Sequence, residues 1–156
     1  MVAPISPAMN RYERIKTLGA GTYGCAVLVK SRADKKMYVV KEIAIGHLSK
    51  EELANVQKEA AVLKDMHHSN IVAYRDSFTE GTKLYIVMDF ADGGDLDGKI
   101  KERKKTGKFF SEQEVMGIFV QICLALKHVH DRRILHRDLK ALVTGEVYLY
   151  IILYLL

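Results

Sequence analysis

A glycine-rich segment flanked by strand-like residues is the feature that most constrains this chain. Residues 19–24 read GAGTYG, which fits the pattern G-x-G-x-x-G. A dinucleotide-binding fold needs a helix after the last glycine, and a triphosphatase loop needs Gly-Lys-Ser/Thr. Here the strand-like segment CAVLV follows instead. The sequence therefore favours a strand–loop–strand hairpin. Its glycines would let backbone N–H groups approach phosphate oxygens, and a glycine turn without a ligand is the alternative for this loop taken alone.

The residues around this hairpin predict strands and one helix. Strand-like segments lie at residues 12–19, 25–31, 37–43, 70–78 and 83–90. Ser49 and Glu52 form a capping box that opens a helix between the third and fourth of these strands. Apolar residues then recur at helical spacing, at Leu53, Val56, Ala60 and Leu63.

The second part of the chain predicts helices. A short basic helix spans residues 96–105 and is ended by Gly107, and Ser111 with Glu114 forms a second capping box. The helix that follows runs to about His130, and DRRILHRDLK then forms a turn and loop. Its apolar stripe consists of Val115, Ile118, Phe119, Ile122, Leu126 and Val129.

Composition narrows the class of protein. The chain has 156 residues, 49% hydrophobic and 28% charged, which is an ordinary globular mix and not a disordered one. A net charge of +5 is too diffuse to predict a nucleic-acid partner. Two cysteines cannot form a disulfide framework, and the N-terminus has no secretory pattern. We therefore expect a cytoplasmic protein without a membrane span, with the cytoskeleton or the nucleus as alternatives, and no metal site at His67 and His68.

Lys41 and Glu59 form a candidate ion pair. Lys41 ends an apolar run and shares a strand face with Val39. Glu59 falls on the buried stripe of the predicted helix, between Val56 and Leu63. A carboxylate on a buried face needs a cation, because an unpaired buried charge costs several kcal/mol or more. Lys41 is the natural partner, although a strand-end lysine that reaches water is the alternative.

Several motifs in order resemble a eukaryotic protein kinase. LGAGTYGCAVLV resembles the glycine-rich flap, with Ala26 where the family usually has valine. YVVKEI resembles the third strand, and LYIVMDF resembles the approach to the hinge. ILHRDLK resembles the start of the catalytic loop. YVVKEI, HHSNIV and DFADGGDL together are most similar to NIMA-related serine/threonine kinases. The resemblance covers residues 12–140.

This resemblance implies an α+β fold with an incomplete second lobe. Residues 1–11 would be an irregular leader. Residues 12–91 would form the N-terminal lobe, a five-stranded antiparallel sheet with one helix. Residues 92–140 would form the first helices of the C-terminal lobe and the start of its catalytic loop, and residues 141–156 are an apolar tail outside the family pattern.

The resemblance also implies a nucleotide site that binds ATP with Mg²⁺. Lys41 would contact the α- and β-phosphates, and Glu59 would hold it in place. Met88 would lie at the back of the pocket, the backbone of Asp89 and Ala91 would bind the adenine, and Asp95 would lie near the ribose. Leu18, Ala26 and Val39 would line the adenine slot. The flap over the phosphates would consist of Gly19, Ala20, Gly21, Thr22, Tyr23 and Gly24.

In the implied reaction, the γ-phosphoryl group of ATP passes to a serine or threonine of a protein. Asp138 would accept the hydroxyl proton and Lys140 would steady the phosphate. Val143 stands where the family has a metal-binding asparagine, and no Asp or Asn follows Asp138. The usual Mg²⁺ ligands are therefore missing. For this polypeptide the residues favour a second reading, an inactive truncated kinase fragment that at most binds nucleotide or a partner.

Two further segments have alternative interpretations. The tail, which ends in VYLYIILYLL, is interpreted as read-through after a gene-model error. The alternatives are an isoform tail that packs on bare apolar faces, or a membrane-inserting end, although ten apolar residues fall short of the roughly 20 that span a bilayer. The basic run is interpreted as a solvated helix face, with an acidic or cytoskeletal partner as the alternative. It consists of Lys99, Lys101, Arg103, Lys104, Lys105 and Lys108.

Overall fold

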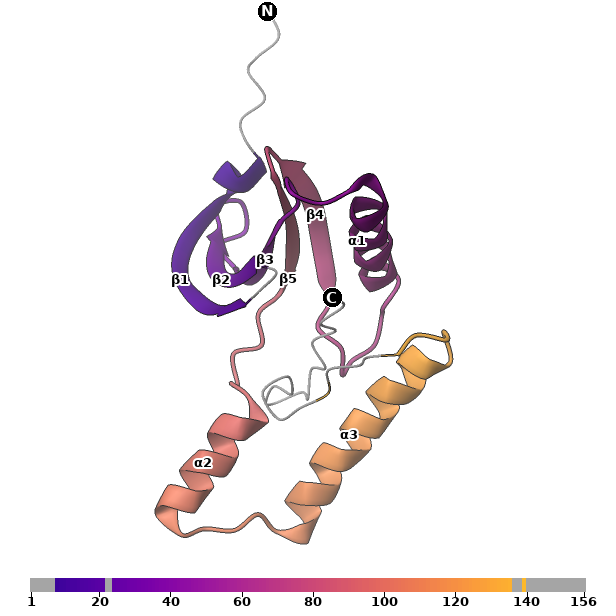
Figure 1. Cartoon of the computed structure of the whole chain (residues 1–156). Coiled ribbons are helices and arrows are strands. Elements are labelled where there is room, and N and C mark those ends of the chain that lie inside the picture. The colour runs from indigo at the N-terminus through magenta and orange to yellow at the C-terminus, as the bar shows by residue number, and fades with distance from the viewer. Residues whose placement is uncertain (1–7, 22–23, 136–138, 140–156) are drawn as a thin grey trace, which may run out of the picture. The chain divides into compact units, whose positions relative to one another are not determined.

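The computed structural model describes residues 8–21, 24–135 and 139, and the chain divides into two compact units (Figure 1). The first unit comprises the described residues up to Lys64 together with Tyr74–Phe90. The second comprises Asp65–Ala73 and the described residues from Ala91 onward.

The first unit is an antiparallel sheet of five strands with one long helix. A short 3₁₀ helix (Ala8–Arg11) precedes strands β1 (Tyr12–Gly21), β2 (Gly24–Ser31) and β3 (Met37–Ala44). Helix α1 (Lys50–Lys64) then leads to β4 (Tyr74–Glu80) and β5 (Lys83–Asp89). The strand order is β1-β2-β3-β5-β4, and α1 lies beside β4 (Figure 1). The α+β class and the five-stranded sheet predicted from the sequence are confirmed.

One predicted strand begins later than the sequence indicated. The pattern from Asn70 predicted strand, but β4 begins at Tyr74. The Asn70 N–H donates to His68 Nδ1 at 3.0 Å, and the Ile71 N–H donates to the His68 carbonyl at 3.1 Å. These local bonds form a turn, so Ile71 and Val72 are buried there without joining the ladder.

The packed face of the sheet has an aliphatic core. The β2–β3–β5 register aligns Val27 with Val40, and Val40 with Val87. Val29 and Tyr85 complete this buried cluster. Alternation along each strand therefore leaves the intervening residues on the opposite face.

A buried carboxylate on β3 joins three strands. The Glu42 side chain is 4% exposed and accepts hydrogen bonds from Arg14 of β1 and from Lys83 Nζ of β5 at 3.2 Å. The hydrogen bond to Glu42 raises the pKa of Lys83. A buried charge is stable only when paired, so this triad holds β1 and β5 against the central strand.

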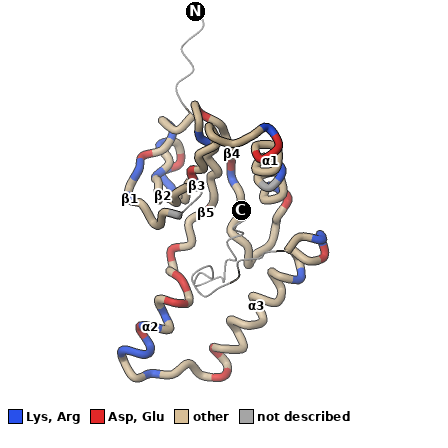
Figure 2. Tube along the Cα trace, viewed as in Figure 1, with Lys and Arg blue, Asp and Glu red and all other residues tan. Residues whose placement is uncertain are grey.

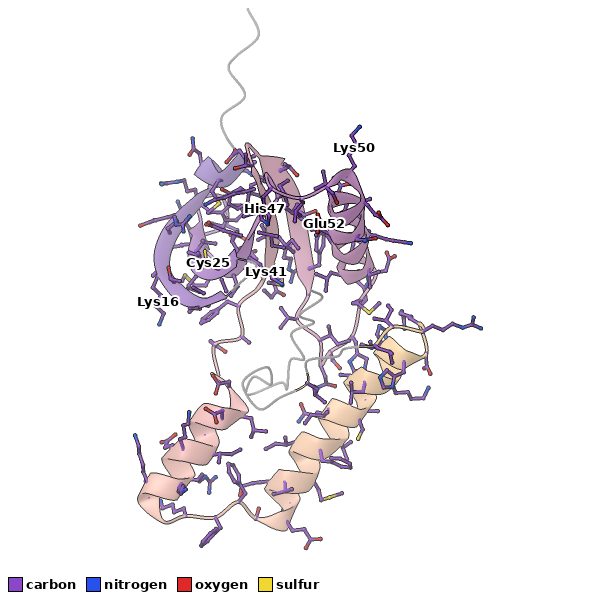
Figure 3. The ribbon with its side chains drawn as sticks, viewed as in Figure 1. Lys16, Cys25, Lys41, His47, Lys50 and Glu52 are labelled. Atoms are coloured by element: carbon purple, nitrogen blue, oxygen red, sulfur yellow. The ribbon has the colours of Figure 1, made fainter. Side chains whose placement is uncertain are left out.

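The capping box predicted at the start of α1 is present. The Ser49 N–H donates to Glu52 Oε2 at 2.8 Å, and the Glu52 N–H donates to Ser49 Oγ at 3.2 Å. Figure 3 labels Glu52 in this first turn. The hydrogen bond from the Ser49 backbone lowers the pKa of Glu52, which favours the ionised cap.

The second unit contains two helices. Helix α2 (Leu96–Thr106) ends at Gly107, and α3 (Glu112–His130) begins with the predicted Ser111–Glu114 capping box. Burial along the apolar stripe of α3 increases toward the end of the helix, with Ile118, Ile122 and Leu126 half-buried. Val115 and Phe119 are 50% and 55% exposed, whereas Ala125 and Val129 are buried. In the part of the chain that the structure describes, no helix combines the length and apolarity needed to cross a membrane.

Two imidazoles are in contact in the second unit. The rings of His68 and His128 lie 5.0 Å apart, and His128 Nε2 is buried without a hydrogen-bond partner among the described residues. Burial is the largest of the causes that lower the pKa of His128, and the nearby charges of Arg132 and His68 lower it further. His67 adds a smaller effect in the same direction, whereas Asp131 opposes it.

The Glu42 triad generates a stability prediction. Replacing both cations in Arg14→Met/Lys83→Met leaves a buried carboxylate without a cation, so we expect a loss of about 3 kcal/mol of unfolding free energy. Urea denaturation measures it. Lys16→Met is the matched control, because it removes an exposed charge from the same strand (Figure 3), and it should change stability by less than about 0.5 kcal/mol. Equal losses in the two variants would contradict the role assigned to Glu42.

The histidine contact generates a pH prediction. A depressed pKa means that the unfolded chain binds the proton more readily than the folded chain. The contribution of His128 to the free energy of unfolding is therefore fully present above the usual histidine pKa of about 6.5, and it is lost as the pH falls below that value. Thermal melts followed by circular dichroism between neutral and mildly acidic pH should show this loss. His128→Gln should reduce it, and an unchanged pH dependence in that variant would rule out His128 as its source.

Candidate nucleotide-binding site

The face of the sheet opposite the valine core gathers four of the predicted nucleotide-binding residues. Ala26 is paired with Lys41 across β2 and β3, and Val39 is paired with Met88 across β3 and β5. Directly opposed residues of antiparallel strands point to the same side, and Val39 and Lys41 are two apart on one strand. The four side chains therefore share one face. It offers a small residue, two apolar residues and one cation.

Lys41 and Glu59 come from different elements of the first unit. Lys41 is half-buried on β3 (Figure 3), and Glu59 lies in α1. Its helical neighbours Val56 and Ala60 are both buried, which agrees with the stripe predicted from the sequence. The Glu59 side chain lies outside the described part of the structure, so its pairing with Lys41 stays a prediction.

The predicted flap is the hairpin of β1 and β2. Gly19 is paired with Ala26, Ala20 with Cys25, and Gly21 with Gly24. A register shift between Thr17 and Gly19 leaves Leu18 between two ladder pairs, where it is 44% exposed. Thr22 and Tyr23 lie outside the described residues. The strand–loop–strand form predicted from the glycine pattern is confirmed.

Different constraints favour glycine at two positions of the flap. Gly24 has a φ of 147°, and a Cβ added there would lie 1.8 Å from the carbonyl oxygen of Glu42. Only glycine fits that position, whatever the ligand. A Cβ added at Gly19 would meet nothing within 4 Å. The fold therefore does not require glycine at 19, whereas close approach of a phosphate would.

An ion pair that the sequence did not predict fixes the end of β5. Arg75 Nε and Nη2 donate to Asp89 Oδ1 and Oδ2, each at 2.5 Å. This two-pronged geometry raises the pKa of Arg75 through its hydrogen bonds to Asp89. The pair joins neighbouring strands at the residue whose backbone is predicted to bind adenine. Arg75 lies at an irregularity of β4, between Tyr74, which is paired with Met88, and Asp76, and the sequence does not reveal this local geometry.

In the second unit, Asp95 has a structural role that the sequence analysis missed. Its Oδ1 accepts a hydrogen bond from the Gly98 N–H at 2.7 Å, so Asp95 is the N-cap of α2. Aspartate is a favoured N-cap, and its position just before the helix could have indicated this. The predicted ribose contact of Asp95 and the adenine contact of Ala91 stay predictions.

The predicted catalytic residues Asp138 and Lys140 lie outside the described residues. Their roles stay predictions. Within residues 8–21, 24–135 and 139, no group of three or more His, Cys, Asp or Glu side chains is placed to hold a metal ion.

Comparison with known proteins identifies the family. The model of the protein kinase domain matches residues 12–142, so the chain belongs to the protein kinase family. The chain is 52% identical over 133 residues to serine/threonine-protein kinase Nek1 of Mus musculus, which covers 85% of this chain and 11% of that protein. Serine/threonine-protein kinase Nek5 of Homo sapiens is 47% identical over 133 residues, covering 85% of this chain and 18% of Nek5.

A more distant relative has the same type of name. Probable serine/threonine-protein kinase nek3 of Dictyostelium discoideum is 42% identical over 144 residues, which is 92% of this chain and 13% of that protein. The predicted similarity to the NIMA-related serine/threonine kinases is confirmed. The chain spans about a fifth or less of the length of these three relatives.

The two glycines generate a prediction that separates fold from ligand. Gly24→Ala should lower the unfolding free energy by a few kcal/mol, because both the backbone angle and the contact with Glu42 forbid a Cβ. Gly19→Ala should leave the urea midpoint nearly unchanged and weaken ATP binding in calorimetry. If Gly19→Ala unfolds the chain, or if Gly24→Ala is tolerated, this division of roles is wrong.

Proposed function

We propose that this chain binds ATP on the Ala26–Val39–Lys41–Met88 face of the sheet, and that it belongs to an enzyme that phosphorylates serine or threonine in proteins. The observation that carries the proposal is the register that places these four residues together. The small Ala26 side chain leaves room for a flat base beside the strands. Val39 and Met88 provide the apolar contacts that adenine stacks on.

Lys41 would supply the charge. Its ammonium group lies on the same face as the apolar residues and carries three donors for phosphate oxygens. The site lies at the end of the β1–β2 hairpin, where Gly19 leaves open space next to the backbone. A phosphate held between Lys41 and the flap backbone would then be oriented by charge from one side and by N–H donors from the other.

The reaction itself would involve residues outside the described part. Asp138 would accept the proton of the substrate hydroxyl, and Lys140 would stabilise the transferred phosphoryl group. Mg²⁺ would supply charge neutralisation of the phosphates when it accompanies such a nucleotide. Among the described residues, no cluster of three or more His, Cys, Asp or Glu side chains is placed to hold this ion, so no residue is assigned to it here.

A second candidate function is nucleotide binding without turnover. The observation that favours it is Val143, which stands where the resemblance places a metal-binding asparagine. The Lys41 face and the flap are retained in this case. The two candidates therefore agree on ATP binding and differ on phosphoryl transfer.

Lys41→Met generates the prediction that tests the nucleotide site. Loss of a charge-assisted contact worth about 1.5–3 kcal/mol should weaken ATP binding by roughly 10- to 100-fold in titration calorimetry. Lys36→Met, an exposed charge in the turn before β3, is the matched control and should bind ATP normally. Unchanged ATP affinity in Lys41→Met, with the fold intact by circular dichroism, would contradict the proposed site.

The same variants separate the two candidate functions. Transfer of labelled γ-phosphate by the 156-residue chain that disappears in Lys41→Met would exclude the candidate without turnover. Glu59→Gln in the same assays tests the predicted ion pair, because unchanged affinity and turnover in that variant would contradict it.

A further inference from the structure

The corner between α2 and α3 presents an unusual surface. Lysine and arginine gather along α2 and on the loop that follows it (Figure 2). In this basic run, Lys101 Nζ lies 2.5 Å from Asp97 Oδ2, and Arg103 Nη2 lies 2.5 Å from Glu114 Oε1. Lys104, Lys105 and Lys108 are exposed. These three lysines belong to the second unit, whereas Lys41 belongs to the first.

Phe109 follows Lys108 in the loop that links α2 to α3. Its side chain is 92% exposed, whereas the other exposed large apolar side chains of the described residues are 44–61% exposed. A phenylalanine left in water forgoes the free energy of burying its ring, so near-complete exposure in an ordered segment needs an explanation.

The loop that carries Phe109 is held in place from both sides. Gly107 adopts φ 66° and donates to the carbonyls of Arg103 and Lys104, and the Lys108 N–H donates to the Arg103 carbonyl at 3.1 Å. Left-handed glycine with this bonding ends the helix in a fixed direction.

Arg103 then braces the residues that follow. Its Nη1 donates to the Phe109 carbonyl at 3.3 Å, and its guanidinium lies 4.8 Å from the centroid of the Phe110 ring. Glu114, which binds the same guanidinium, also caps α3 at Ser111. The backbone of Phe109 is therefore anchored to both helices, so a partner would meet a preorganised side chain at a reduced entropic cost.

We propose that Lys104, Lys105, Lys108 and Phe109 form a docking surface, the basic–aromatic corner, for an acidic protein segment that carries aliphatic side chains. Phe109 packs against an aliphatic side chain of that segment. The three ammonium groups face its carboxylates and supply long-range attraction. This is the combination of one aromatic anchor and a charged rim that concentrates binding energy in protein interfaces.

The neighbouring charges favour a protein partner over a nucleic acid. Exposed carboxylates at Glu102 and Glu112 lie on the same two helices and would repel a continuous phosphate backbone. The nearby guanidinium of Arg103, which suits phosphate best, is held by Glu114. An acidic peptide can place its carboxylates discontinuously and leave these positions to uncharged residues.

Fluorescence anisotropy with the full 156-residue chain tests the corner. The probe is a fluorescein-labelled peptide of Glu-Glu-Leu-Glu repeats, compared with Glu-Glu-Ser-Glu repeats of equal charge and with single-stranded oligothymidine. We expect the leucine peptide to bind more tightly than both and to weaken with added salt. Phe109→Ala should weaken its binding about tenfold, the equivalent of roughly 1.4 kcal/mol.

Matched variants distinguish binding at the basic–aromatic corner from nonspecific hydrophobic or electrostatic binding elsewhere on the chain. Phe119→Ala removes another exposed phenylalanine of the same unit and should leave the affinity unchanged. Lys104→Gln/Lys105→Gln/Lys108→Gln should abolish most of the binding, whereas Lys30→Gln/Lys35→Gln/Lys36→Gln, an equal charge change on exposed residues of the first unit, should have little effect.

Several outcomes would overturn the proposal. They are no binding of the leucine peptide, tighter binding of oligothymidine, an unchanged affinity in Phe109→Ala, or equal losses in the corner and control variants. Circular dichroism of each variant shows whether the fold is retained, and an unfolded Phe109→Ala would itself contradict the surface role assigned to that residue.

Discussion

The register of three central strands is the constraint on which the first unit depends. Strand side chains alternate between two faces, so one alignment of β2, β3 and β5 decides both the core and the candidate site. Val27, Val40 and Val87 meet on one side. A slip of one residue would bring Lys41 into that core and expose the valines. The residues that stabilise the sheet therefore also position the nucleotide face.

Glu42 links these two roles. Its carboxylate holds Arg14 and Lys83 on the packed side, while its carbonyl lies where a side chain at Gly24 would have to fit. The end of the flap therefore packs against the same residue that ties β1 and β5 to β3. Lys41 immediately precedes Glu42 on β3, so a rigid β3 fixes the position of the cation relative to the flap.

The sequence allowed the parts governed by local patterns to be predicted. The hairpin around the glycines follows from strand propensity on both sides of the loop, and the capping boxes at Ser49 and Ser111 follow from spacing. Features that depend on register or loop geometry could not be read in this way. Arg75 and Asp89 meet beside the Tyr74–Met88 pair, at an irregularity of β4. Arg103 braces the Phe109 loop only after the helix has ended at Gly107. The predicted start of β4 was wrong because a turn centred on His68 competed with the apolar pattern.

Methyl NMR during an ATP titration tests the central claim most directly, since it reports on the two faces of the sheet separately. The account predicts that ATP shifts the methyl signals of Ala26, Val39 and Met88, while those of Val27, Val40 and Val87 stay in place. Shifts confined to the valine core, or no shift on either face at millimolar ATP, would contradict the assignment of the Lys41 face as a nucleotide site.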